Sequence, residues 1–415
     1  MKILFIHQNF PAQFKHLAPA LVKQGHDVTA LKLKKDVREE WAGWDQINLE
    51  EYEILRGTSP TVHPWVSDFE SKTIRGEACY RAAIALREKG YIPDKIIAHH
   101  GWGESMFLKQ VWPNAKLGIY CEFHYHPSGA DVGFDQEFES ADVAAPCRIS
   151  HKNLNNLVHF PLADGAISPT YWQASTFPDS FRDKITVVHD GIDMDVVKPH
   201  SKASITLTNG KEITGDDEVV TFVNRDLEPY RGYHIFMRAL PKMLEERPEA
   251  RFIIIGGDGV SYGAAPDKKK FGDKSWKKIF INEIAPRMSK EDWNRVHFVG
   301  KVPYDVFLRV LQISSAHIYL TYPFVLSWSL LEAMSIGCAI VASDTQPIQE
   351  AIVHNDTGLL VDFFDSDSLA ETVGSLLSDP SLRKRLGANA RAFADETYNL
   401  RTKCLPQQLS WVEQL

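Results

Sequence analysis

The sequence predicts an α/β protein made of two Rossmann-like domains, and three observations support this prediction. Short apolar segments alternate with amphipathic segments, a pattern typical of parallel sheets covered by helices on both faces. The alternation begins at residue 2, is interrupted by a polar stretch after Pro199 and then starts again. A chain of 415 residues is also too long for one ordinary hydrophobic core.

The first half of the chain opens with a βαβ pattern. Residues 2–6 are a continuous apolar run, residues 14–25 have helical periodicity that ends at Gly25, and residues 26–31 form a second apolar run. Further strands are expected at residues 95–100, 117–124, 164–168 and 184–193.

The second half repeats this alternation. A helix is expected at residues 233–248, and strands are expected at residues 218–225, 250–259, 295–302, 315–322, 338–344 and 357–364. Residues 204–214 predict a small hairpin with an Asn209–Gly210 turn. We therefore expect an N-terminal domain over residues 1–198, a C-terminal domain over residues 199–395, and a helix over residues 396–415 that returns to the N-terminal domain.

Composition excludes several classes of protein. The formal charge is −8, and no basic stripe with interleaved aromatic residues is present, which argues against nucleic-acid binding. The five cysteines form no C-x-x-C pair, which favours a reducing compartment. The sequence shows neither a signal-peptide pattern nor an apolar run of transmembrane length, so we expect a cytoplasmic protein. Short basic runs at residues 32–35 and 268–270 leave peripheral membrane contact open.

Glu332 is a carboxylate within the otherwise apolar or small residues 323–337. Ser329 and Glu332 have the spacing of a capping box, in which both side chains satisfy N–H groups in the first turn of a helix. The alternative is that Glu332 belongs to a binding site.

Two arginines, Arg225 and Arg231, follow the strand expected at residues 218–225. The carboxyl ends of such strands face ligands, and two guanidinium groups there suit a diphosphate. The alternative is a pair of surface arginines neutralised by Asp226 and Glu228.

Two histidines, His124 and His126, lie at the end of the strand expected at residues 117–124. Side chains two apart on a strand share one face, so a metal pair is conceivable, although no third ligand is evident. A single working histidine in a cleft and a buried structural histidine are the other two interpretations.

Taken together and in order, the segments GHDV, VVHDGID, R-x5-RG, IIIGGDG, HFVGKV, LLEAMSIGCAIVASD and NDTGLLV resemble the family 4 glycosyltransferases, which are retaining enzymes with the GT-B fold. The resemblance spans nearly the whole chain. It implies transfer of a sugar from a nucleotide diphosphate sugar to a hydroxyl acceptor such as a glycan or glycolipid. No Asp-x-Asp motif follows an expected strand, so we expect no metal and no further cofactor.

The resemblance also assigns roles to residues. It implies that Arg225 and Arg231 hold the diphosphate, that Glu332 binds the ribose, that Val302 neighbours the base, and that His124 lies near the sugar and phosphate. The expected catalytic residues are His124, Arg225, Arg231 and Glu332. The expected donor-binding residues are Arg225, Arg231, Gly257, Val302, Ser327, Ser329 and Glu332, and further sugar or acceptor contacts are expected from Gln13, His100, His126 and Phe324.

Three departures from the family pattern concern the donor side and the first loop. Phe324 stands where the family has its first glutamate, eight residues before Glu332. Arg231 replaces a lysine and lies one residue later than usual, and residues 9–14 replace a glycine-rich loop. Two alternatives therefore stay open: a non-catalytic relative that acts as a nucleotide-binding partner or regulator, and another GT-B enzyme such as a sugar-nucleotide epimerase or phosphorylase.

Overall fold

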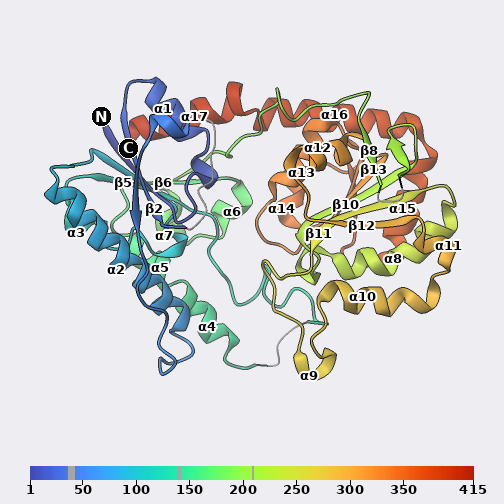
Figure 1. The fold of residues 1–415 in the computed structure, drawn as a ribbon, viewed down its shortest axis with the longest axis horizontal. Helices are drawn as coiled ribbons and strands as arrows, with labels where there is room; N and C mark the ends of the chain where they lie inside the picture. Colours follow the sequence, from blue (N-terminus) through green and yellow to red (C-terminus); the bar gives the residue numbers. More distant parts are fainter. Residues whose placement is uncertain (36–42, 139–141, 208–209) are drawn as a thin grey trace. The chain divides into compact units, whose positions relative to one another are not determined.

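The structure, a computed structural model, describes residues 1–35, 43–138, 142–207 and 210–415. It divides into two units, Met1–Gly191 with Leu400–Leu415, and Ile192–Asn399 (Figure 1). The chain crosses between them at residues 191/192 and 399/400, whereas the sequence placed these points at residues 198/199 and 395/396. Ile192 forms a parallel bridge with Asn399 and donates its N–H to the carbonyl of Tyr398, which fixes both crossing points.

The first unit is built on a parallel sheet with the order β3-β2-β1-β4-β5-β6-β7. Its strands are β1 (Lys2–Ile6), β2 (Asp27–Leu33), β3 (Asn48–Tyr52), β4 (Lys95–Ala98), β5 (Lys116–Tyr120), β6 (Gly165–Ser168) and β7 (Ile185–Val187). Its helices are η1 (Ala12–Phe14), α1 (Leu17–Lys23), η2 (Trp44–Gln46), α2 (Ser67–Glu88), η3 (His100–Trp102), α3 (Leu108–Val111), α4 (Ala145–Lys152), α5 (Leu154–His159), α6 (Tyr171–Ser175), α7 (Asp179–Arg182), η6 (Leu400–Cys404) and α17 (Leu405–Gln414).

Both faces of this sheet are apolar, as the continuous apolar runs in the sequence predict. Leu4 and Ile6 pack on one face with helix α2, whereas Ile3 and Phe5 pack on the other with α1 and α17. Helix α1 ends at Lys23, and Gly25, which follows the C-cap Gln24, has a φ of +83° that is costly for residues with a Cβ, so the predicted glycine stop is confirmed.

The C-terminal helix α17 is held against this first sheet. Trp411 lies so close to Gly118 on β5 that a Cβ there would be 2.8 Å from the indole. The Lys95 Nζ donates to the last carbonyls of the helix, those of Val412 (2.6 Å) and Glu413 (2.9 Å). The C-terminal segment therefore belongs structurally to the first unit.

The second unit contains a six-stranded parallel sheet with the order β12-β11-β10-β13-β14-β15 and a separate hairpin. Its strands are β8 (Ser204–Thr206), β9 (Glu212–Thr214), β10 (Val219–Asp226), β11 (Arg251–Gly257), β12 (Val296–Gly300), β13 (Ala316–Tyr319), β14 (Ile340–Ser343) and β15 (Leu359–Val361). Its helices are η4 (Pro229–Arg231), α8 (Tyr233–Glu246), α9 (Lys268–Phe271), α10 (Trp276–Ile284), η5 (Ala285–Arg287), α11 (Lys290–Trp293), α12 (Tyr304–Gln312), α13 (Trp328–Ile336), α14 (Gln346–Gln349), α15 (Ser366–Ser378) and α16 (Pro380–Tyr398).

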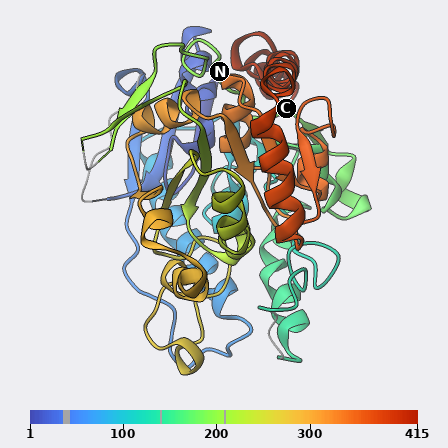
Figure 2. The ribbon, with the colours of Figure 1, turned by 90° about the vertical axis from the view of Figure 1, so that its right-hand side faces the viewer.

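Side chains alternate between the two faces of the second sheet. Val219 and Val223 pack with helices α12, α13 and α16, whereas helices α8 and α15 pack against each other. Figures 1 and 2 show the strands of this sheet between helices. The two predicted parallel sheets are thus confirmed.

The predicted hairpin is present as the antiparallel pair β8 and β9, while Asn209 of its expected turn lies outside the described residues. Among the helices of the described ranges, none is long and apolar enough to cross a membrane.

Candidate functional site

The second sheet changes its direction of winding between β10 and β13, and the loops that leave these two strands meet there. Such a switch point, at the carboxyl ends of parallel strands, is where α/β sheets bind ligands. Arg231, on η4 after β10, donates to the Thr321 hydroxyl after β13 at 2.7 Å and contacts the Val325 carbonyl oxygen at 3.4 Å. Arg231 is only 3% exposed, so it ties the two loops together from inside.

Arg225 differs from Arg231 in its surroundings. It lies next to the last residue of strand β10 and is exposed, and its side chain makes no hydrogen bond or ion pair with the residues that the structure describes. Of the two predicted diphosphate ligands, Arg225 is thus the one whose guanidinium is open to an anion.

Asp226 and Glu228 form no ion pair with either arginine in the described part of the chain, so the alternative interpretation, a pair of neutralised surface arginines, is wrong. The Asp226 Oδ1 accepts from the Gly259 N–H at 3.1 Å and pairs with Lys301 at 3.0 Å. The Glu228 carboxylate accepts backbone N–H groups of Ser261 (3.0 Å), Tyr262 (3.1 Å) and Gly263 (3.0 Å). Both acids therefore anchor the loop after β11, residues 258–263.

These contacts affect the pKa of each acid differently. Burial raises the pKa of Glu228, although its three backbone N–H donors oppose the shift. Burial also acts to raise the pKa of Asp226, but hydrogen bonds from Ser261 and Lys301 outweigh it and the net shift is downward.

An aromatic cluster covers the buried arginine. The ring of Tyr262 lies 4.6 Å from the Arg231 guanidinium, a cation–π contact. Phe324 meets Tyr262 and Tyr230 edge-on, at centroid distances of 5.7 and 5.3 Å, and Tyr322 lies 4.8 Å from Tyr230. Phe324 is 6% exposed, so this position is part of a packed aromatic cluster.

The start of helix α13 shows that Glu332 is not a helix cap. Ser327 is the N-cap and its hydroxyl accepts from the Ser329 N–H at 3.3 Å. Because the helix begins at Trp328, Ser329 is already inside the first turn and Glu332 lies beyond it. The capping-box interpretation is therefore wrong, and the two serines mark the start of the helix that carries Glu332.

Glu332 is held by a tyrosine from the neighbouring helix. Tyr304, the first residue of α12, donates its hydroxyl to the Glu332 Oε1 at 2.6 Å. Burial, and then the Glu332 charge, raises the pKa of Tyr304, so its hydroxyl stays protonated. Glu332 is 9% exposed, whereas Tyr304 is 50% exposed.

Two further predicted donor residues flank this edge. Gly257 ends β11, and a Cβ there would lie 2.4 Å from the Lys301 side chain and 2.5 Å from the Asp226 Oδ1. The close approach of the Lys301–Asp226 pair explains the glycine. Val302 is half-buried and lies two residues before Tyr304, packed against the core.

The first unit has its own switch point, between β1 and β4, and histidines occupy it. His7 directly follows β1 and His99 directly follows β4, with ring centroids 5.2 Å apart. Burial, and then His99, lowers the pKa of His7 to about 3, so its ring is neutral near pH 7. The His7 Nδ1 accepts from the Asn9 N–H at 2.9 Å, which places the ring proton on Nε2.

An exposed aromatic and a carboxylate adjoin these histidines. His99 stacks between Tyr120 and Trp102, at centroid distances of 5.3 and 6.3 Å, and its Nε2 lies 3.6 Å from the Glu122 carboxylate. Trp102 is 39% exposed although His99 is only 2% exposed. This edge therefore combines two imidazole rings, of which His7 is uncharged near pH 7, with an exposed indole face and one partly exposed carboxylate.

His100 and Gln13, both predicted contacts, take different places in the first unit. His100 is 2% exposed, with Nδ1 3.0 Å from the Tyr120 carbonyl oxygen and Nε2 2.6 Å from the Asn156 Oδ1. Both of its ring nitrogens thus face other residues of the protein, and burial lowers the pKa of His100 well below the usual value. Gln13 lies on η1 and interacts with His7.

His124 and His126 lie beyond the end of β5, so their predicted place on a strand is wrong. Strand β5 ends at Tyr120, and its neighbour β6 is followed by Pro169, which has no N–H to extend the pairing. His124 packs against Phe177 at 5.9 Å, and burial, followed by His126, lowers its pKa to about 4. The His126 Nε2 donates to the Thr176 carbonyl oxygen at 2.7 Å.

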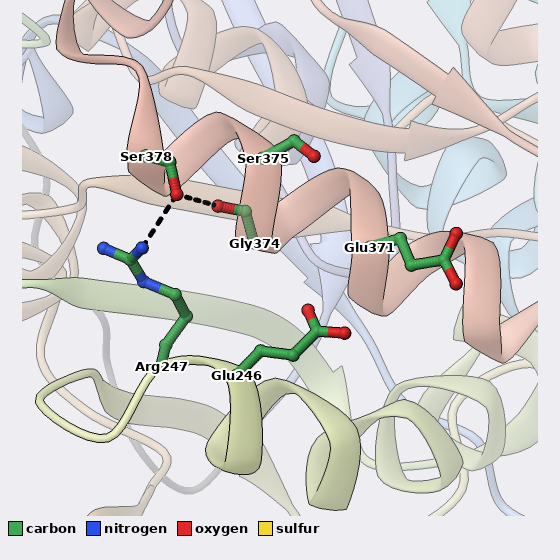
Figure 3. A pocket seen from close by; sticks show the side chains of 6 residues that line it. All are labelled: Glu246, Arg247, Glu371, Gly374, Ser375 and Ser378. Atoms are coloured by element: carbon green, nitrogen blue, oxygen red, sulfur yellow. Dashed lines mark hydrogen bonds between the residues drawn. The ribbon is translucent and has the colours of Figure 1, made fainter.

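A pocket of about 540 Å³ lies elsewhere in the second unit, between α8 and α15. Figure 3 shows Arg247 pointing to Ser378, with Glu246 next to Arg247 and Glu371 at the other end of the pocket. Arg247 also pairs with Glu218, the residue before β10, so the pocket adjoins the amino ends of the strands. It is thus at the opposite edge of the sheet from Glu332.

Sequence reasoning missed His7, His99, Trp102 and Tyr304. The signal for the two histidines was their position directly after apolar runs, where a parallel sheet presents its carboxyl edge. Tyr304 has no such signal, because its partner lies 28 residues away.

Comparison with known proteins places this chain in a family. Residues 24–197 match the glycosyl transferase family 4 group, and residues 206–393 match the glycosyl transferases group 1. D-inositol 3-phosphate glycosyltransferase of Kribbella flavida is 26% identical over 211 residues, covering 50% of this chain and 46% of that protein. The same enzyme of Mycobacterium sp. (strain KMS) is 28% identical over 213 residues, covering 51% and 44%. The chain thus spans about half the length of the curated relatives it matches.

Solved structures share the fold over the full chain. Sucrose-phosphate synthase from Thermosynechococcus elongatus superposes with a TM-score of 0.73 at 18% identity, covering 100% of this chain and 99% of that one. Anabaena Alr3699/HepE in complex with UDP gives a TM-score of 0.67 at 16% identity and covers 100% of both chains. With two matched glycosyl transferase families and two Rossmann-like units of the GT-B type, this chain belongs to the family 4 glycosyltransferases.

Proposed function

We propose that this protein is a retaining, metal-independent glycosyltransferase that moves a sugar from a nucleotide diphosphate sugar to a hydroxyl acceptor. The observation that carries the proposal is the Glu332 carboxylate, which is buried beside the switch point of the second sheet and fixed by Tyr304. A buried carboxylate that is not a helix cap suits the paired hydroxyls of a ribose. Alr3699/HepE, which shares the fold, was solved with UDP and with UDP-glucose.

The charge of the departing diphosphate is met in this proposal by cationic side chains. Arg225 is exposed at the end of β10, and Lys301 extends from the end of β12, 63% exposed at its side chain. Cations placed where negative charge develops stabilise the transition state. Arg231 supports the same edge from inside, because it braces the loop that leads to α13.

The proposed reaction breaks the bond between the anomeric carbon and the donor phosphate oxygen and forms a bond from that carbon to the acceptor oxygen. The acceptor proton passes to the departing phosphate on the same face of the sugar, which retains the anomeric configuration. The half-buried ring of His124 has a pKa lowered to about 4, so it is uncharged near pH 7 and a weak base, and we assign it packing or a hydrogen bond rather than proton transfer.

The acceptor is bound, in this proposal, at the switch point of the first sheet. The exposed face of Trp102 offers a platform for the apolar face of a sugar ring, and Glu122 offers oxygens for hydroxyl groups. His7 and His99 supply rings and nitrogens but, for His7, no positive charge near pH 7. This edge favours a polyhydroxylated ring over a strongly anionic acceptor.

Purified protein incubated with labelled nucleotide sugars tests the proposal. We expect release of nucleoside diphosphate that depends on an added glycoside and that persists in EDTA, with the α or β configuration of the donor kept in the product. Binding of a nucleotide sugar without turnover would favour a non-catalytic partner. Conversion of the donor without an acceptor would favour an epimerase, and loss of activity in EDTA would contradict metal independence.

A further inference from the structure

We infer that Tyr304 is a positioning residue for nucleotide recognition: its hydroxyl fixes the Glu332 carboxylate in the orientation that reads the ribose. The inference rests on the proposed function, which places the ribose at Glu332. It assigns to a tyrosine outside the recognised motif a part in donor selectivity.

The contact itself is short and one-directional. Tyr304 Oη lies 2.6 Å from the Glu332 Oε1, and a protonated phenol can only donate to a carboxylate. An ionised carboxylate offers about four acceptor sites, and the Tyr304 hydroxyl occupies one of them. The tyrosine therefore orders the carboxylate without occupying all of it.

The position of Tyr304 is set by its surroundings. Its ring stacks on Phe307, one turn later in α12, at a centroid distance of 5.7 Å and an angle of 27°. Phe307 is buried in the core that α12 shares with α13, the helix of Glu332. The hydroxyl is thereby held relative to Glu332 by two packed helices.

The exposure of Tyr304 separates this role from a purely structural one. Tyr304 is 50% exposed, and Tyr304→Phe deletes only its hydroxyl. The substitution therefore takes no buried apolar group out of the core. Two residues before it, Val302 lies in the segment expected to meet the base. Tyr304 thus connects the segment assigned to the base with the carboxylate assigned to the ribose.

The test compares Tyr304→Phe with a matched control that loses the same chemical group. Tyr52 in the first unit donates its hydroxyl to the buried Glu104 Oε1 at 2.8 Å, so Tyr52→Phe also deletes one tyrosine–glutamate hydrogen bond. Each variant is titrated by calorimetry with UDP and with 2′-deoxy-UDP, and with the same pairs for GDP and ADP. Thermal unfolding without ligand is measured in parallel.

We expect Tyr304→Phe to weaken binding of the preferred ribonucleotide about three- to ten-fold and its 2′-deoxy form less. In a Glu332→Gln background the same change should have no further effect, because the positioned group is gone. Tyr52→Phe should lower the unfolding temperature but leave nucleotide affinity unchanged.

Unchanged or tighter ribonucleotide binding by Tyr304→Phe would overturn the inference, as would equal weakening of the ribo and deoxy forms. If Glu332→Gln weakens binding while Tyr304→Phe does not, the proposed function stands and the inference fails. If the unmodified protein binds none of UDP, GDP and ADP, both are contradicted.

Discussion

The two sheets have the same winding around their switch points, but they place different chemistry there. In the second unit the end of β10, η4 and helix α13 carry Arg225, Arg231 and Glu332 respectively, and two further acids, Asp226 and Glu228, hold the loop after β11. In the first unit the segments after β1 and β4 carry two histidine rings, of which His7 is uncharged near pH 7, and an exposed tryptophan. One edge is suited to an anion with a diol, the other to an uncharged ring.

The comparison also concerns what is buried. In the second unit Glu228 accepts hydrogen bonds from backbone N–H groups and Asp226 pairs with Lys301. The charge of these two acids therefore holds the loop at residues 258–263 in place. In the first unit His7 and His189 are buried, and burial lowers the pKa of each to about 3, so both rings are neutral near pH 7. Two units with the same fold thus differ: the second is stabilised at this edge by charged groups, and the first by groups that must stay uncharged.

The largest expected effect is that the stability of the first unit falls more with decreasing pH than the stability of the second unit. Burial lowers the pKa of His159 to about 4 and of His189 to about 3 in the first unit, and that of His317 to about 4 in the second. The unfolded chain binds a proton below about pH 6.5, so each contributes stability above that pH that is lost as pH falls toward 4. For a fully buried histidine the loss by pH 5 is about 2 kcal/mol.

Hydrogen exchange of the full chain at pH 7 and pH 5, corrected for intrinsic rates, measures this. Protection in β1, β4 and β5 should fall more than protection in β10 and β13, because His7 and His100 add to the effect in the first unit. Equal loss in both units would contradict the comparison.

The next effect separates the two arginines. Arg231→Ala removes a buried group with several acceptors and should lower the stability of the second unit by about 2–3 kcal/mol. Arg225→Ala should leave the unfolding temperature unchanged and weaken nucleoside diphosphate binding by about 1.5–3 kcal/mol. Thermal unfolding and calorimetry check both, and a stable Arg231→Ala protein would show that the inner brace is misassigned.

Replacement of the central carboxylate should act on binding alone. Glu332→Gln is expected to weaken nucleotide binding by at least about 1.5 kcal/mol, since an amide accepts poorly from two hydroxyls. Because Ser327 caps α13, the unfolding temperature without ligand should barely move. A drop of several degrees with intact affinity would make Glu332 structural.

The smallest expected effect lies in the first unit. Trp102→Ala should raise the KM for a glycoside acceptor about five- to ten-fold, because burying one apolar ring face contributes roughly 1 kcal/mol. Nucleotide affinity should stay unchanged. Tyr171→Ala, which alters an exposed aromatic on α6, is the control. If both variants raise KM alike, Trp102 has no special contact with the acceptor.

Sequence patterns predicted the sheets well because apolar runs report burial on both faces of a strand. They predicted the position of Glu332 and Arg225 at a carboxyl edge for the same reason. The error at His124 arose because the run of apolar residues continues past Tyr120, whereas hydrogen bonding stops near Pro169 on another segment. The register of a neighbouring strand is not a local property.

Sequence patterns likewise did not predict contacts between segments that lie far apart along the chain. Asp226 and Glu228 lie next to the arginines in the sequence, yet they bind a loop more than thirty residues later. The buried state of Arg231 depends on Thr321, ninety residues away. Charge proximity along the chain therefore predicted the wrong partners, although it marked the right edge of the sheet.

The most direct test of the central claim, that the second unit binds the nucleotide, is hydrogen exchange of the full chain with and without saturating UDP. The account predicts slower exchange in residues 225–231, 300–304 and 327–332. If the protein prefers guanine or adenine over uracil, GDP or ADP should slow exchange in the same residues. Slower exchange confined to the first unit, in residues 7–14 and 99–102, would contradict it.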